Sequence, residues 1–312
     1  MQDPILHHYE DSPFSEKMRA LLGFKKMTYS SVEIPVIMPK PQLTALTGGY
    51  RRTPVMQSGA DIYCDTALIT QLIEKLQPSP AVTGLQPVAL ASAAARWTDN
   101  EFFRVCVGLV FQPRALAANP RFNDPGAAEA FIRDRAELTA GSKGLATPLP
   151  LAEAVFRQHM SELEITLQLY PFLAGEGPGI VDFSTWHCCW FVARQEVLAD
   201  YFAPFPTVRS WMERMRQLRH GAGISTLSGE EAVAIAAAAQ PAPLQDNSID
   251  ESTGLSRGQS VQVMPTDYGF QPVSGSLLAV TDKQISVARS DDRAGAVHVH
   301  FPRYGFEVNA AT

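Results

Sequence analysis

The sequence has few cysteines, no long apolar run and no excess of basic residues. Its four cysteines are Cys64, Cys106, Cys188 and Cys189. They form no CxxC pair, which argues against a disulfide framework and favours reduced thiols in a cytoplasmic compartment. The longest apolar runs, such as AVAIAAAA, fall well short of the roughly 18 residues that span a bilayer. The N-terminus also lacks a basic and then apolar leader, so we expect neither a signal peptide nor a membrane partner.

The charge balance excludes a further class of partner. The 312 residues include 26 basic and 32 acidic side chains, a formal net charge of −6. No long basic stripe is present, so we expect no nucleic-acid partner. With 46% hydrophobic and 19% charged residues, the chain has the composition of a folded globular protein. Its length allows two or three domains of roughly 100–200 residues each.

The first 80 residues alternate between strand and helix patterns. The expected order is a strand (5–9), a helix (13–25), a strand (28–34), a proline-rich connector (35–52), a hairpin (55–63) and a helix (66–76). This is a βαβ unit followed, after the connector, by a ββα unit.

From residue 88 to about 221 the strand patterns vanish and helical patterns recur. Long helical segments are expected over 88–111, 124–138, 150–170, 179–195 and 205–218. Ser228 and Glu231 then match a capping box before an alanine-rich helix. Five short alternating runs over 255–308 predict a small β-barrel or sandwich. The predicted domains are therefore 1–80, an all-helical domain 86–225, a helix with a linker 226–250, and an all-β domain 251–312.

Three short motifs bring polar groups to the starts of helices and strands. Ser12 precedes Pro13, so Ser12 is a good N-cap for a helix with proline at its first position. Thr53-Pro54 opens an apolar strand, a place where a cis bond is often found. Asp65-Thr66 stands at a strand-to-helix turn, where it also fits a cap. The order of the elements brings all three motifs to one edge of a single small sheet.

With these motifs, residues 3–221 resemble the glutathione transferase family. SPFSEKMRALL is similar to its first-helix motif, RRTPVM to its cis-proline motif and CDTALI to its acid–hydroxyl motif. GIVDFSTWH resembles the capping element of its helical domain, although Gly179 replaces the usual hydroxyl residue while Asp182 is kept. The resemblance implies an α+β protein with a thioredoxin-like domain and an all-helical domain. It would be a Ser-type bacterial member with an added barrel-like β domain.

The resemblance implies Ser12 as the catalytic hydroxyl. Free thiols have a pKa of about 8.5, so a donor to sulfur and the positive end of a helix would favour the glutathione thiolate. Tyr9 is the alternative, because some classes use a tyrosine at the end of the first strand. The implied glutathione-binding residues are Ser15, Lys40, Thr53, Pro54, Asp65 and Thr66. Trp97, Phe102, Phe103 and Arg104 would line the second-substrate pocket, and Asp99 would reach glutathione across a dimer interface.

One histidine pair suggests a metal ligand set by its spacing. His298 and His300 lie two residues apart in a strand pattern, so their side chains share a face. No third ligand is evident in the sequence, so we expect surface histidines and no metal.

The sequence therefore predicts a cytoplasmic, homodimeric glutathione transferase that attacks a small electrophile, a detoxification chemistry with glutathione as cosubstrate. One alternative is a non-catalytic module for glutathione binding, ligand binding or dimerisation. The other is a glutathione-dependent isomerase, lyase or dehalogenase.

Overall fold

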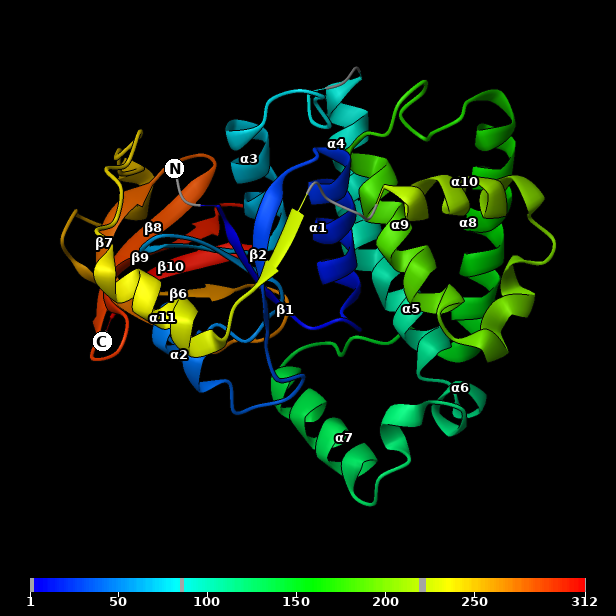
Figure 1. Ribbon diagram of the computed structural model, residues 1–312, viewed down its shortest axis with the longest axis horizontal. Coiled ribbons are helices and arrows are strands. Elements are labelled where there is room, and N and C mark those ends of the chain that lie inside the picture. Colours follow the sequence, from blue (N-terminus) through cyan, green and yellow to red (C-terminus); the bar gives the residue numbers. More distant parts are fainter. Residues whose placement is uncertain (1–2, 85–86, 219–222, 312) are drawn as a thin grey trace.

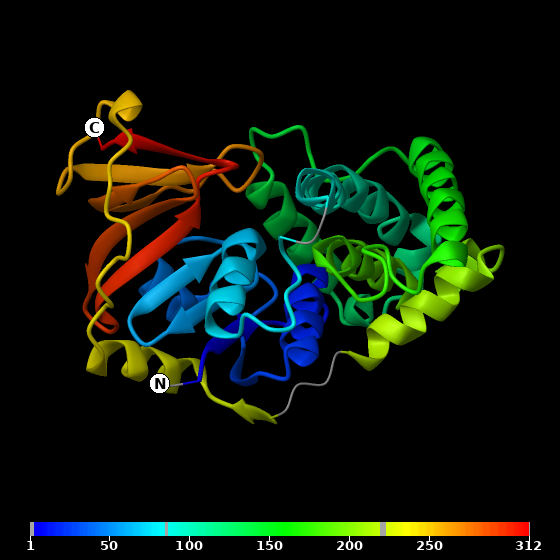
Figure 2. The ribbon, with the colours of Figure 1, turned by 90° about the horizontal axis from the view of Figure 1, so that it is seen from above.

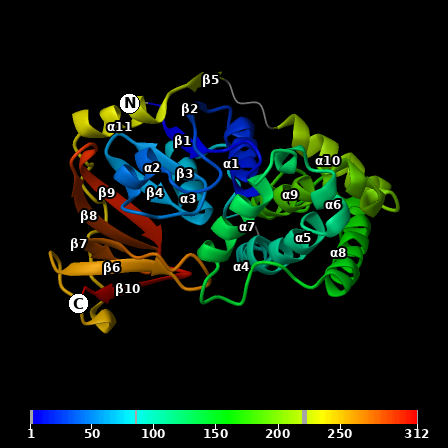
Figure 3. The same cartoon turned by 90° about the horizontal axis from the view of Figure 1, so that it is seen from below.

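The computed structural model describes residues 3–84, 87–218 and 223–311. Residue 86, the expected start of the helical domain, lies outside the described residues. The described part combines a thioredoxin-like unit, a helical unit and a C-terminal β extension, as the α+β prediction requires (Figure 1). Seen from below, the thioredoxin-like unit lies between the other two (Figure 3). Across the described helices, no segment is long and apolar enough to cross a membrane.

The thioredoxin-like unit has the expected order with one added helix. It consists of β1 (Ile5–His8), α1 (Pro13–Phe24), β2 (Thr28–Glu33), α2 (Pro41–Thr47), β3 (Val55–Ser58), β4 (Asp61–Cys64) and α3 (Thr66–Leu76). β1 pairs parallel with β2 and antiparallel with β3, and β3 pairs antiparallel with β4. The helix α2 lies inside the predicted connector. It begins at a proline and ends at Gly48, whose φ of 78° stops a helix at little cost.

The second unit is helical, as predicted, but the first expected helix, 88–111, is divided into two. It contains α4 (Val88–Trp97), α5 (Phe103–Val110), α6 (Pro113–Ala117), α7 (Ala127–Leu138), α8 (Leu149–Leu169), α9 (Ile180–Ala193) and α10 (Pro206–Gln217). A π-helical turn, Thr98–Phe102, separates α4 from α5 inside the expected 88–111 helix. The apolar helix α9 packs against α1, α4 and α5 and so joins the helical unit to the thioredoxin-like unit.

The C-terminal extension continues the thioredoxin-like sheet. Its strands are β6 (Ser260–Pro265), β7 (Val273–Val280), β8 (Gln284–Asp291), β9 (Gly295–Pro302) and β10 (Phe306–Ala310). β9 pairs parallel with β4, so the described strands form one sheet in the order β10-β6-β7-β8-β9-β4-β3-β1-β2-β5. The five predicted runs are all strands, but they extend an existing sheet where a separate barrel-like domain was expected.

The opposite edge of the sheet is also covered. β5 (Gly223–Thr226) pairs parallel with β2, within a region that the sequence predicted to be helical. The following helix α11 (Gly229–Ala238) confirms the Ser228–Glu231 capping box and packs against α2 and β9. Unpaired strand edges favour association with other chains. In this chain, segments from far along the sequence pair with both edges of the original four strands.

Candidate functional site

The three units meet at a cavity of about 400 Å³. The thioredoxin-like unit contributes Phe14 at the start of α1, the Thr53–Pro54 turn and the start of α3. The helical unit contributes the π-helical turn and the start of α5. The extension contributes two loops, Thr266–Tyr268 and Tyr304–Phe306. The first of these loops reaches from the extension toward the end of α7, where the Gly269 N–H donates to the Leu138 carbonyl at 2.9 Å (Figure 2).

Four of the predicted glutathione-binding residues line this cavity together. They are Thr53, Pro54, Asp65 and Thr66. The Thr53–Pro54 bond is cis, as its position suggested. Asp65 caps α3 by accepting from the Ala67 N–H at 2.9 Å, and burial raises the pKa of its carboxyl. The cavity therefore combines a backbone edge at the proline turn with the positive end of an 11-residue helix.

The two predicted catalytic hydroxyls do not line the cavity. Ser12 is 2% exposed, and its Oγ accepts from the Ser15 N–H at 3.2 Å, which makes it the N-cap of α1. The preceding residue, Asp11, forms ion pairs with Arg121 and Arg194, which bring the helical unit against the start of α1. Ser12 follows Asp11 directly, and Phe14, two residues further on, lines the cavity.

Ser15 and Tyr9 also lie outside the cavity lining. The Ser15 hydroxyl is buried and has no hydrogen-bond partner among the described residues. The ring of Tyr9 lies 5.6 Å below the Lys40 ammonium.

Lys40 is not among the residues that line the cavity, whereas Arg52 is. Lys40 is 5% exposed and donates to the Thr53 hydroxyl at 3.3 Å. Burial, with nearby arginines, lowers the pKa of Lys40 to about 8. Arg52 lines the cavity, and its guanidinium lies 3.8 Å from the centre of the Tyr268 ring. It also pairs with Asp267 and donates to the Tyr268 carbonyl, so it holds the extension loop over the cavity.

Two of the predicted second-substrate residues line the cavity and two do not. Phe103 and Arg104 line the cavity. Trp97 and Phe102 do not; they stack on each other at 5.7 Å between ring centroids. The extension supplies Tyr304 in their place, with the Arg96 guanidinium 5.4 Å from its ring centre.

The comparisons with known proteins agree with this arrangement. Residues 6–81 match the family model described as glutathione S-transferase, N-terminal domain. A GST-like protein from Pseudomonas syringae has a crystal structure that is 38% identical, with a TM-score of 0.82 over 100% of both chains. The chain belongs to the glutathione S-transferase superfamily. Because that match spans both chains completely, this GST-like protein of Pseudomonas carries the C-terminal extension as well.

Two more distant matches each cover 68% of this chain. A glutathione S-transferase from Rhodospirillum rubrum shares the fold, with 16% identity and a TM-score of 0.53 over 68% of this chain and 87% of that one. FtsZ-localized protein A of Caulobacter vibrioides is 22% identical over 221 residues, 68% of this chain and 86% of its own length.

Asp99, which lines the cavity, is the centre of a charge network. Asp99, in the π-helical turn, accepts from the Lys17 ammonium at 2.6 Å and contacts the His187 Nε2 at 3.0 Å. Burial alone would raise the pKa of Asp99, but Lys17 and His187 lower it to about 2. Lys17 and His187 are 1% and 0% exposed. The expected reach of Asp99 across a dimer interface stays a prediction, since the described contacts of its carboxylate lie within the chain.

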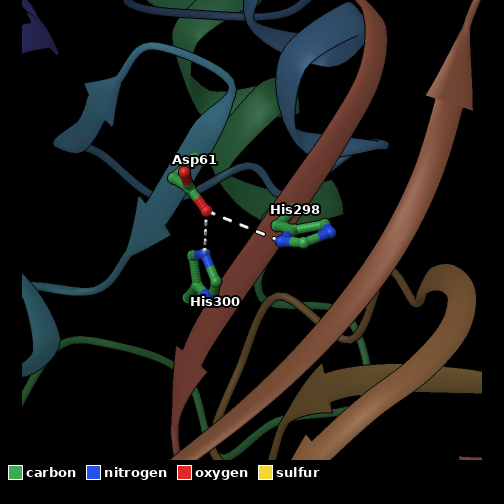
Figure 4. A group of neighbouring side chains, drawn as sticks. All are labelled: Asp61, His298 and His300. Atoms are coloured by element: carbon green, nitrogen blue, oxygen red, sulfur yellow. Dashed lines mark hydrogen bonds and ion pairs between the residues drawn. The ribbon is translucent and has the colours of Figure 1, made fainter. Parts of the chain in front are cut away.

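The prediction of surface histidines without a third neighbour is wrong. His300 is 1% exposed, and its Nε2 lies 3.0 Å from an oxygen of Asp61, with His298 beside them (Figure 4). The sequence offered no local signal for Asp61, because β4 and β9 are more than 230 residues apart.

A second, larger hollow of about 870 Å³ lies at the other end of α1. Phe24, Lys25 and Pro80 are among the residues that line it. None of the predicted site residues belongs to its described lining, so the cavity at the start of α1 is the candidate active site.

Proposed function

We propose that the chain binds glutathione in the 400 Å³ cavity and transfers it to a small electrophile. The observation that supports this most strongly is the convergence of the cis-proline turn, the start of α3 and the start of α1 on one cavity. Thr53 would pair its backbone with the cysteinyl part of the peptide. Asp65 would receive the γ-glutamyl ammonium, and Thr66 the γ-glutamyl carboxylate at the helix N-terminus.

The second substrate would enter between the helical unit and the extension. Phe103, Arg104 and Tyr304 offer it aromatic faces and a guanidinium. In this proposal the C-terminal extension forms a wall of the electrophile pocket, and Arg52 keeps that wall in place through Asp267 and Tyr268. Homodimerisation and a cytoplasmic location belong to the same proposal.

The first test is glutathione binding by a Thr66→Val variant. A hydrogen bond to a charged group contributes about 1.5–3 kcal/mol, so we expect glutathione affinity to fall by about 10- to 100-fold. Isothermal titration calorimetry with glutathione measures this directly. Thr166→Val is the matched control, because Thr166 lies on the exposed face of α8 and should leave affinity unchanged. Equal affinity in all three proteins, or no binding to the wild type, would contradict the proposed site.

The second test separates the two roles of Ser12. Its Oγ accepts from the Ser15 N–H, and its hydroxyl hydrogen has no acceptor among the described residues, so donation to a thiolate would not compete with the cap. We expect Ser12→Ala to lower the free energy of unfolding by about 1 kcal/mol through loss of the cap. We also expect kcat/KM to fall at least about tenfold with a chromogenic electrophile. A folded variant with unchanged kcat/KM would leave Ser12 as a cap only, and Tyr9→Phe would then be assayed.

One observation favours a non-catalytic function as the second candidate. Neither Ser12 nor Tyr9 lines the cavity among the described residues, so glutathione can be held there without either of the two predicted hydroxyls against its sulfur. The name of the Caulobacter relative gives a location at FtsZ and no reaction. Glutathione binding without turnover of conjugation, isomerase, lyase or dehalogenase substrates would favour this candidate.

A further inference from the structure

The pairing of β4 with β9 places three ligand-type side chains on one face of the sheet. In this parallel pair, Asp61 lies beside His298, and Tyr63 lies beside His300. Side chains two residues apart in a strand point to the same face. Asp61, from the thioredoxin-like unit, therefore faces both histidines of the extension (Figure 4).

The three donor atoms lie at distances that suit one small cation. Asp61 Oδ1 is 3.0 Å from His300 Nε2 and 3.7 Å from His298 Nδ1, and all three atoms lie within 4.8 Å of one another. Zinc bonds of about 2.0–2.1 Å in tetrahedral geometry place donor atoms about 3.3 Å apart. Only small side-chain movements would bring these atoms to that spacing.

His298 Nδ1 gives an independent indication of a missing ligand. This atom is buried, and among the described residues it has no hydrogen-bond partner. Buried polar atoms nearly always have one, so an orphan ring nitrogen aimed at a carboxylate requires an explanation. A cation between Asp61 and the two imidazoles would supply its partner.

The outer contacts of the group fix the orientation of two ligands. The other ring nitrogen of His300 lies 2.9 Å from the Ser286 hydroxyl, which can accept its N–H when Nε2 binds a cation. The Gln284 amide nitrogen, 3.1 Å from the same atom, can only donate, so that amide would rotate away from a protonated ring nitrogen. The other oxygen of Asp61 accepts from the Ala242 N–H at 2.8 Å. Hydrogen bonds of this kind to the far side of a ligand are typical of protein metal sites, because they set ring tautomer and angle.

We propose that Asp61, His298 and His300 bind a zinc ion that fastens the C-terminal extension to the thioredoxin-like sheet. Two imidazoles and a carboxylate are a donor set that zinc prefers. This proposal is independent of glutathione binding, because none of the three residues lines the 400 Å³ cavity.

The experiment uses the full-length, tag-free protein stripped with a chelator. Equilibrium dialysis against zinc measures stoichiometry and affinity, and cobalt titration reads coordination through its visible d–d bands. The key variant is His298→Asn, which removes the partly exposed ligand and should fold even if Asp61→Asn does not. His159→Asn on α8 is the matched control for general histidine binding.

We expect one zinc ion per wild-type chain, tetrahedral cobalt bands and a higher melting temperature with zinc. His298→Asn should bind zinc at least about tenfold more weakly and lose the cobalt bands, while His159→Asn should behave as the wild type. Substoichiometric zinc in the wild type would overturn the proposal. Wild-type affinity in His298→Asn, or an equal loss in His159→Asn, would overturn it as well.

Discussion

Replacing Asp182 by alanine is expected to lower the free energy of unfolding by at least about 4 kcal/mol. The carboxylate is 0% exposed and accepts four hydrogen bonds. Its donors are the backbone N–H groups of Leu173, Ala174 and Gly179 at 2.7, 3.1 and 3.0 Å, and the Trp211 indole at 2.9 Å. Alanine would leave four donors, two of them buried and two part-buried, without this acceptor. Each buried unsatisfied group costs about 1–3 kcal/mol.

The four bonds also join three segments of the helical unit. Asp182 lies in the first turn of α9 and holds the loop before that helix and the side chain of Trp211 on α10. Urea unfolding followed by tryptophan fluorescence measures the loss. Asp200→Ala is the control, because Asp200 is an exposed carboxylate paired with an exposed Arg114, and we expect a change within about 0.5 kcal/mol. A loss below about 2 kcal/mol for Asp182→Ala would show that water or a backbone shift replaces the carboxylate.

Asp182 also shows what a local motif can predict. The spacing from Gly179 to Asp182 indicated the start of a helix, although the glycine lacks the usual hydroxyl. In the structure the carboxylate bonds to the Gly179 N–H, which glycine supplies as well as serine does. The same holds for Ser12 as a cap and for Asp65 at the start of α3, because each cap depends on groups two or three residues apart.

Contacts between distant segments are not marked by any local motif of this kind. The alternating runs near the C-terminus predict strands, but their pattern does not say which edge they pair with. Asp61 was therefore predicted as part of a hairpin, and Arg52 as the last residue of the proline-rich connector. Their partners, His300 and Asp267, lie 239 and 215 residues further along the chain. The short helix α2 was missed for another reason, since proline and glycine at its ends suggested a loop.

The burial of Ser12 could not be predicted from the sequence either. A motif predicts which residue stands at the start of a helix, whereas its exposure depends on what packs over it. Here Arg121 and Arg194 converge on Asp11 from two places in the helical unit. The four binding residues that line the cavity could be predicted because they lie at the ends of elements, within 15 residues of one another. The part of the cavity wall that comes from the extension could not be predicted, because it lies at least 200 residues further along the chain.

Replacing Asp99 by alanine is the second change with a large expected effect. The ammonium of Lys17 lies 2.6 Å from Asp99, and its side chain is 2% exposed. Removing one partner of a buried ion pair leaves the other charge uncompensated, which costs about 3–5 kcal/mol. A double variant, Lys17→Met with Asp99→Ala, should recover part of this loss, because it removes the orphaned charge. Additive losses in the double variant would show that the pair is not coupled.

The pH dependence of unfolding tests the same network. The folded pKa of Asp99 is about 2, below the value of about 3.9 for an unfolded aspartate. A lowered folded pKa contributes stability that is present above about pH 4 and is lost as the pH falls toward 2. A pKa difference of nearly two units corresponds to about 2.6 kcal/mol. Between these pH values, the free energy of unfolding measured with urea should therefore fall less steeply with falling pH in Asp99→Ala than in the wild type. An exposed control, Asp282→Ala, should follow the wild-type curve, and parallel curves for Asp99→Ala would contradict the ion pair.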